Sequence, residues 1–264
     1  MGFEELPEGC IAAILSRTTP LDACRLSLVS KIFRAAADSD AVWDRFLPSD
    51  YRTIISQSSF VPNNPSKKVL YLALSDNPII IDQGKKSFQL DKKSGKKCYM
   101  LAARALLIIW GDTTEYWNWT SLPDSRFPEV AELIDVCWLE IRGVINAIAL
   151  SPNTQYAAYL VFKMNNARGF HNRPVELSVS IHGGQSNTKS VCLDPNLEGR
   201  PNNGVVGLQR PNERSDGWLE IEMGEFFNTG LEDEVEMTVM ENRGGNWKSG
   251  FFLEGLEIRP KELN

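Results

Sequence analysis

The stretch Val175-Glu176-Leu177-Ser178-Val179-Ser180-Ile181 alternates between apolar and polar side chains without a break. Successive side chains of a β-strand point to opposite faces, so this repeat predicts a strand with one buried and one solvated face. The same alternation recurs over residues 156–164, 219–223 and 235–239, and turn-forming residues such as Ser151-Pro152-Asn153 lie between the strands. Many short strands with frequent turns are typical of an antiparallel β-sandwich with a jelly-roll-like fold, which we expect over residues 95–264.

Residues 1–50 carry a helical pattern instead, with apolar residues at steps of three and four. Thr19 followed by Pro20 is a helix start, because the hydroxyl caps the first turn and proline suits the first helical position. Ser30, and then Ser39 or Asp40, are expected to begin further short helices. A unit of roughly 45 residues in short helices buries little surface alone, which favours a docking element that has a partner. The alternative is that these helices only pack on the β domain.

Residues 51–94 are mixed in character. A short helix is expected over 69–74, and short strands over 78–81 and 88–90. We interpret this region as a connector that packs on the C-terminal domain. The chain is therefore predicted to be an α+β multidomain protein, with a helical domain at 1–50, a connector at 51–94 and a β-sandwich at 95–264.

Composition narrows the classes of function. The net charge of −6 argues against a nucleic-acid partner, which usually requires a basic surface. The first residues are acidic rather than basic and apolar, so a secretory signal is not expected, and no apolar run is long enough to predict a membrane partner. The five cysteines are an odd number, widely scattered, as expected of reduced thiols in the cytoplasm and/or nucleus. Two histidines and no Cys-x-x-Cys pair argue against a metal site.

An ordered set of residues near the N-terminus resembles the F-box pattern. The set comprises Leu6-Pro7-Glu8, Ile11, Ile14, Leu15, Pro20, Asp22, Arg25-Leu26-Ser27, Val29-Ser30, Phe33 and Trp43. The resemblance implies docking on the Skp-family linker protein of a cullin-based ubiquitin ligase. The partner-binding residues it implies are Leu6, Pro7, Ile11, Ile14, Leu15, Leu26, Val29 and Phe33.

Three later stretches resemble the phloem protein 2-type lectins, also called Nictaba-type. They are Trp110-Gly111-Asp112, Tyr116-Trp117-Asn118-Trp119, and Gly245-Asn246-Trp247-Lys248-Ser249-Gly250 with Ile258-Arg259-Pro260-Lys261. Related lectins bind N-acetylglucosamine oligomers or the cores of N-glycans, through a pair of tryptophans and a pair of acidic residues. The resemblance implies carbohydrate binding by Trp110, Trp117, Trp119, Glu234 and Glu241. Together the two resemblances indicate a plant F-box protein of the phloem protein 2-like class.

Each of these site residues has a structural alternative. Large apolar side chains at helical spacing usually form a core, and tryptophans often fill sandwich interiors. Glu234 and Glu241 are seven residues apart, so on one unbroken strand they point to opposite faces. Both can serve one site only if a bulge intervenes or Glu241 lies past the end of the strand. Glu220 and Glu222 share a strand face as a glycosidase pair would, but such acids commonly face solvent.

The combined interpretation is a non-catalytic adaptor that needs no cofactor. The helical domain binds the linker and, through it, a cullin; the lectin-like domain binds a target protein, either through an N-glycan or without sugar. The alternative is a nucleocytoplasmic carbohydrate-binding lectin that acts in stress or defence without ligase function.

Overall fold

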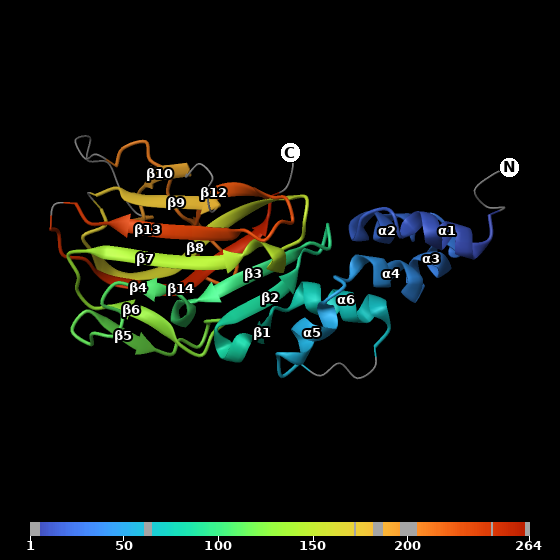
Figure 1. The fold of residues 1–264 in the computed structure, drawn as a ribbon, viewed down its shortest axis with the longest axis horizontal. Helices are drawn as coiled ribbons and strands as arrows, with labels where there is room; N and C mark the ends of the chain where they lie inside the picture. Colours follow the sequence, from blue (N-terminus) through green and yellow to red (C-terminus); the bar gives the residue numbers. More distant parts are fainter. Residues whose placement is uncertain are drawn as a thin grey trace. The chain divides into compact units, whose positions relative to one another are not determined.

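The structure is a computed structural model that describes residues 6–60, 65–171, 173–181, 187–195, 205–243 and 245–261. It divides into two compact units (Figure 1). The first comprises Met1–Gln83 and Ser87–Cys98, and the second comprises Gly84–Lys86 and Tyr99–Asn264. None of the helices in these described ranges is long and apolar enough to cross a membrane.

The first unit is mainly helical. Its helices are α1 (Glu8–Leu15), α2 (Pro20–Leu26), α3 (Lys31–Asp38), α4 (Asp40–Phe46), α5 (Tyr51–Ser56) and α6 (Lys67–Asp76). The predicted helix starts are confirmed, because the side chains of Thr19, Ser30 and Ser39 accept hydrogen bonds from backbone N–H groups of α2, α3 and α4. A short 3₁₀ helix, η2 (Asp82–Gly84), follows β1 (Ile79–Ile81) and precedes β2 (Lys86–Leu90).

Trp43 is the centre of this unit. Its ring is fully buried, and its Nε1 donates a hydrogen bond to the carbonyl oxygen of Ala37 at 2.6 Å. The rings of Phe46 and Tyr71 lie 5.5 and 5.1 Å from it, centroid to centroid. In the division into compact units, residues 51–83 and 87–98, which hold most of the predicted connector, group with the helices, and Tyr71 of α6 packs against Trp43. The predicted packing of the connector on the C-terminal domain stays a prediction.

The second unit consists of two antiparallel sheets, as predicted. One sheet has the strand order β3 (Lys97–Ala102), β14 (Ser249–Pro260), β8 (Thr154–Arg168), β12 (Leu219–Asn228) and β11 (Asn212–Glu213). In the same sheet β6 (Val130–Leu133) pairs with β14 and with β5 (Trp117–Thr120). The other sheet has the order β10 (Asn187–Val191), β9 (Val175–Ile181), β13 (Glu234–Glu241), β7 (Leu139–Asn146) and β4 (Leu107–Ile108). Short 3₁₀ helices, η3 (Ala103–Ala105) and η4 (Ala147–Ala149), follow β3 and β7.

The core of this unit lies between the two sheets. Val175, Leu177 and Val179 of β9 are all buried, as the alternation predicted. The two sheets pack closely at Gly143 of β7, where an added Cβ would lie 2.8 Å from Cδ1 of Leu256 on β14, and at Gly224 of β12, where it would lie 3.2 Å from Cγ2 of Val179 on β9. Glu176, Ser178 and Ser180, the polar residues between these apolar positions, therefore lie on the outer face of the five-stranded sheet.

Candidate functional site

The residues predicted to bind the linker fall into three groups by exposure. Ile11 and Leu15 are buried in the core of the helical unit, so their direct contribution is to hold α1 in place. Leu26 and Phe33 are half-buried. The exposed ones are Leu6, Pro7, Ile14 and Val29.

Two further exposed apolar residues, Leu28 and Ile32, were missed in the sequence. Leu28 lies in the turn after α2, outside the helical repeat, and Ile32 lies in the first turn of α3, one turn before the buried Ala36. We define the apolar surface as Leu6, Ile14, Leu28, Val29 and Ile32. Exposed apolar side chains of this size, gathered on one small unit, are typical of a protein-interaction surface.

The three predicted sugar-binding tryptophans do not form one open surface. Trp117 is buried in β5, so neither face of its ring is open to a ligand. Trp119 is half-buried, its Nε1 donates to the carbonyl oxygen of Gly111 at 3.0 Å, and the guanidinium of Arg104 lies 3.6 Å from its ring centroid. Trp110 is the exposed member of the three. It is held beside Tyr116 at 5.1 Å and adopts a φ of 60°, a strained conformation for a bulky residue.

The two predicted acidic residues lie at opposite ends of β13. This strand runs unbroken from Glu234 to Glu241 and pairs with β7 along its whole length. The odd spacing therefore puts the side chains on opposite faces. Glu234 is exposed, whereas Glu241 points into the core and forms an ion pair with the fully buried Lys248. The structure does not bring these two carboxylates to one site.

A different tryptophan is presented to solvent beside the five-stranded sheet. Trp138 directly precedes β7 and is 43% exposed. Its Nε1 donates to Oε2 of Glu140 at 2.9 Å, and Nε of Arg142 donates to the other oxygen of that carboxylate at 2.7 Å. Glu140 itself is only 6% exposed. The indole ring is thus fixed by a buried carboxylate while much of its surface stays open.

Backbone hydrogen bonds bring Trp138 close to two other exposed tryptophans. The N–H of Ile109, next to Trp110, donates to the carbonyl oxygen of Glu140 at 3.0 Å. Val136 and Lys248 exchange two backbone hydrogen bonds, which places Trp247 beside the same segment. We call Trp110, Trp138 and Trp247 the tryptophan end. It lies where β13 ends and β7 begins, at the left of the sandwich in Figure 1.

The sequence contains a signal for Trp138 that the tryptophan motifs obscured. Residues 138–142 alternate, with Leu139 and Ile141 buried. Trp138, Glu140 and Arg142 occupy the polar side of this alternation. A tryptophan on the polar side of an amphipathic strand is not needed for the core, and so it is a candidate for binding.

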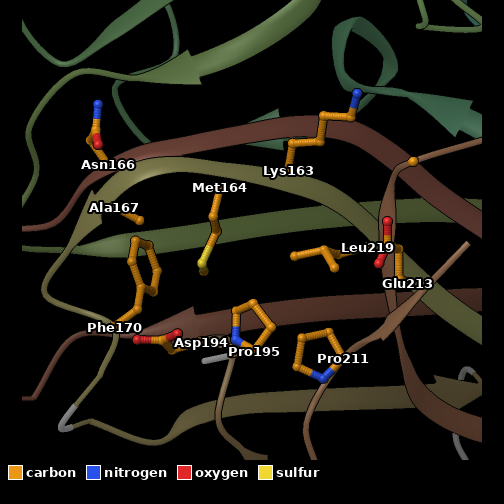
Figure 2. Close-up of a pocket in the computed structure, with 11 residues that line it drawn as sticks. Lys163, Met164, Asn166, Ala167, Phe170, Asp194, Pro195, Pro211, Glu213 and Leu219 are labelled. Carbon is orange, nitrogen blue, oxygen red and sulfur yellow. The ribbon is translucent and has the colours of Figure 1, made fainter. Parts of the chain in front are cut away.

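A separate hollow of about 830 Å³ opens beside the C-terminal half of β8 (Figure 2). Met164, Leu219, Pro195 and Pro211 point toward its centre, whereas the ammonium group of Lys163 points away. Phe170 lines the hollow but is only 2% exposed, because its ring stacks on Phe251. The described lining therefore offers no open aromatic face to a sugar, in contrast to the tryptophan end.

The outer face of the other sheet is occupied by ion pairs. Glu220 accepts from Arg214 and Arg259, and Glu222 pairs with Lys189 and Lys261. These two carboxylates are therefore engaged by cations and do not form an open glycosidase pair. In the ranges that the structure describes, no group of three or more histidine, cysteine or acidic residues is arranged to hold a metal ion.

Comparison with known proteins gives consistent matches over the whole chain. The family model described as F-box domain matches residues 3–45, and the model described as Phloem protein 2 matches residues 96–260. An F-box protein of Arabidopsis thaliana is 46% identical over 98% of this chain and 80% of its own length. The Arabidopsis thaliana F-box protein PP2-B10 is 44% identical over 99% of this chain and 95% of its own length.

One of the solved structures that match is a family 35 carbohydrate binding module from Clostridium thermocellum. The match covers 61% of this chain and 96% of the module, with 9% identity and a TM-score of 0.35. A likeness this distant says nothing about what the present chain binds.

Proposed function

Because the chain belongs to the F-box proteins of the phloem protein 2 family, we propose that it is a non-catalytic substrate-recognition adaptor of a cullin-based SCF-type ubiquitin ligase. The helical unit binds a Skp-family linker protein, and the lectin-like unit binds a target protein. Ubiquitin transfer is carried out by other subunits. The adaptor acts by raising the effective concentration of the target near them.

The apolar surface is the observation that carries this proposal. Leu28 and Val29 are 76% and 67% exposed, and Ile32 is 39% exposed, on a unit whose core is complete without them. Burial of apolar side chains is worth about 25 cal/mol per Å² removed from water, so a partner that covers this surface gains binding free energy. Apolar anchors at the centre of an interface commonly carry most of that free energy.

The cysteines support action in the cytoplasm and/or nucleus. Cys10, Cys24, Cys137 and Cys192 form no disulfide in the structure, and Cys10 is exposed. Unpaired thiols are typical of compartments that keep cysteines reduced. The cysteines therefore support a cytoplasmic and/or nuclear location for the proposed adaptor.

A double substitution, Val29→Asp with Ile32→Asp, tests the proposed docking. Two carboxylates at a desolvated apolar interface cost several kcal/mol, so co-purification with a recombinant Skp-family linker is expected to be lost. Val69→Asp is the matched control, because Val69 is 55% exposed on α6 of the same unit but lies outside the apolar surface. Circular dichroism checks that all variants fold.

The same experiment separates the two functional hypotheses. Linker binding by the wild type and by Val69→Asp, but not by the double variant, supports the adaptor. A wild-type chain that binds no linker, yet binds glycans, favours the alternative of a nucleocytoplasmic lectin without ligase function. The exposed tryptophan end is the observation that keeps this alternative open.

A further inference from the structure

We propose that one end of the lectin-like unit binds a short protein segment that combines apolar side chains with lysine or arginine. The inference rests on the proposed role of this unit in holding a target, and it names the kind of target and the surface. The surface lies where β7 and β12 end and β13 begins, at the opposite end of β7 from the tryptophan end (Figure 1).

Two chain connections at this end are joined by hydrogen bonds. One is residues 147–153, between β7 and β8, and the other is residues 229–233, between β12 and β13. The side-chain amide of the buried Asn228 donates to two carbonyl oxygens of the first connection, at 2.9 and 3.0 Å. The N–H of Ala147 donates to the carbonyl oxygen of Asp233 at 2.8 Å. The two connections therefore form one ordered surface.

Four apolar side chains on this surface are open to solvent. Leu231 is 66% exposed, Ile148 is 54% exposed and Phe227 is 49% exposed, and Pro152 is exposed as well. A Cβ added to Gly230 would lie 2.8 Å from Cβ of Pro152, so the two connections touch next to Leu231. We call Ile148, Pro152, Phe227 and Leu231 the loop patch. Exposed apolar side chains gathered on one ordered surface are typical of a protein-interaction site.

Negative charge borders the loop patch. The three residues directly after Leu231 are Glu232, Asp233 and Glu234, and the first and third of these are exposed. Among the residues that the structure describes, none forms an ion pair with these three acids. A lysine or arginine of a bound protein would therefore meet carboxylates that have no cation of their own.

Lys261 lies near the loop patch but does not neutralise this charge. Its backbone N–H donates to the carbonyl oxygen of Gln155, which pairs with Phe227 in the sheet. Its ammonium group lies 2.5 Å from Glu222 and 3.0 Å from Glu225, so one cation is already engaged by two carboxylates. The surface around the loop patch is therefore acidic.

Apolar side chains with an acidic border select the class of partner. A segment of apolar and basic residues complements both features, because its apolar groups leave water while its cations meet the border. A second copy of this chain would bring the same acids to a two-fold interface, and a membrane or nucleic acid would bring further negative charge. A basic and apolar protein segment is the occupant that the surface fits.

Binding of defined peptides to the full-length chain tests the inference. The probe is a short, fluorescein-labelled amphipathic peptide of leucine and lysine. The references are the same peptide with glutamate in place of lysine, and a peptide of the same composition in scrambled order. Fluorescence anisotropy should show that the wild type binds the leucine–lysine peptide about tenfold or more tightly than either reference. Binding should weaken as salt is added, because salt screens exposed charges.

Substitutions test the apolar and the acidic part separately. Ile148→Ser with Leu231→Ser is expected to weaken peptide binding about tenfold or more, because two apolar anchors are lost. Leu107→Ser is the matched control, since Leu107 is 57% exposed on β4 (Leu107–Ile108) of the same unit but outside the loop patch. Glu232→Lys should weaken binding about fivefold or more at low salt, whereas Glu115→Lys makes the same change of charge at another exposed position and should leave binding within about twofold.

Four results would overturn the inference. They are no preference of the wild type for the lysine peptide over the glutamate peptide, affinity of the Ile148→Ser/Leu231→Ser variant within about twofold of the wild type, an equal loss in Leu107→Ser, or wild-type dimerisation that the double variant abolishes. The last result would show that the loop patch holds a second copy of the chain. Circular dichroism checks that all variants fold.

Linker binding is measured on the same samples. Peptide binding without linker binding would contradict the adaptor alone, and linker binding without peptide binding would contradict the loop patch alone.

Discussion

Glu257 on β14 is nearly buried and lies among three guanidinium groups. Its side chain is 7% exposed, and its oxygens are 3.1 Å from Arg126, 2.6 Å from Arg214 and 3.2 Å from Arg259. Burial alone would raise the pKa of this carboxyl, but the attraction of Arg126 and Arg214 is stronger and holds the pKa below its ordinary value. Glu257 is therefore ionised in the folded protein under all but strongly acidic conditions.

Glu257→Gln is expected to lower the free energy of unfolding by about 3–5 kcal/mol at pH 7, because it leaves buried guanidinium charge unbalanced. A carboxyl with a lowered folded pKa stabilises fully above its unfolded pKa of about 4.3, and this contribution is lost as the pH falls through the folded value. The difference between wild type and variant should therefore shrink in acid. Urea unfolding from pH 7 to pH 3 measures it.

The control for this substitution is Glu129→Gln. Glu129 pairs with Arg104 at 2.9 Å, but both side chains are more than 40% exposed. Solvent screens such a pair, so its removal should change stability by about 0–1 kcal/mol. A Glu257→Gln difference that is constant across the pH range would contradict the role assigned to its charge.

The exposure and the position of single side chains in the candidate site were the hardest features to predict from the sequence. The spacing of seven placed Glu234 and Glu241 on opposite faces, and the unbroken β13 confirms it. The same reasoning could not separate Trp117 from Trp110, because exposure depends on what covers a ring. Trp117 sits in a paired strand against β6, whereas Trp110 lies in the turn after β4. Trp138 was overlooked because the tryptophan motifs at residues 110–119 obscured it, although its alternation with the buried Leu139 and Ile141 places it on the polar side of the strand.

At the scale of elements, β14 is the strand on which the larger sheet is organised. It pairs with β8 along most of its length and with β3 and β6 on its other side. Its register with β8 shifts between Ser249 and Phe251, and again between Leu253 and Gly255. At the second shift the backbone of β3 comes so close that a Cβ on Gly255 would lie 2.0 Å from the carbonyl oxygen of Leu101.

Gly255→Ala is expected to destabilise the protein by about 3 kcal/mol or more, because the added methyl group meets backbone that cannot move without breaking the ladder. Gly217→Ala is the comparison. Gly217 has a φ of +78° but no atom within 4 Å of an added Cβ, so only the backbone strain of about 1–2 kcal/mol applies. Urea unfolding monitored by tryptophan fluorescence measures both. If Gly255→Ala and Gly217→Ala lose the same free energy of unfolding, the close approach of β3 is not the reason that position 255 requires glycine.

Elements were predicted well where a local signal exists. The caps at Thr19, Ser30 and Ser39 gave the helix starts, and alternation located β8, β9, β12 and β13. The order of strands has no such signal. β14, the last strand in the chain, lies between β3 and β8, because pairing between distant segments is decided by how both faces pack. For the same reason, the sequence carries no signal that Tyr71 contacts Trp43.

At the scale of the whole molecule, the proposed function requires both units on one chain. Tethering works only when the segment that holds the linker is covalently joined to the segment that holds the target. Resin carrying an N-acetylglucosamine tetramer, the kind of sugar that the resemblance to phloem protein 2-type lectins implies, should therefore retain the linker only in the presence of the intact chain. The Val29→Asp/Ile32→Asp variant should bind the resin without the linker, and Trp138→Ala should bind the linker without the resin.

An equimolar mixture of these two variants is the decisive sample. Each keeps one of the two binding surfaces, so the mixture contains both surfaces but on separate molecules. We expect it to retain no more linker on the resin than either variant alone, as measured by quantitative immunoblotting of the eluate. Retention by the mixture at the wild-type level would show that the two surfaces need not share a chain, and an adaptor that works by tethering could not behave in that way.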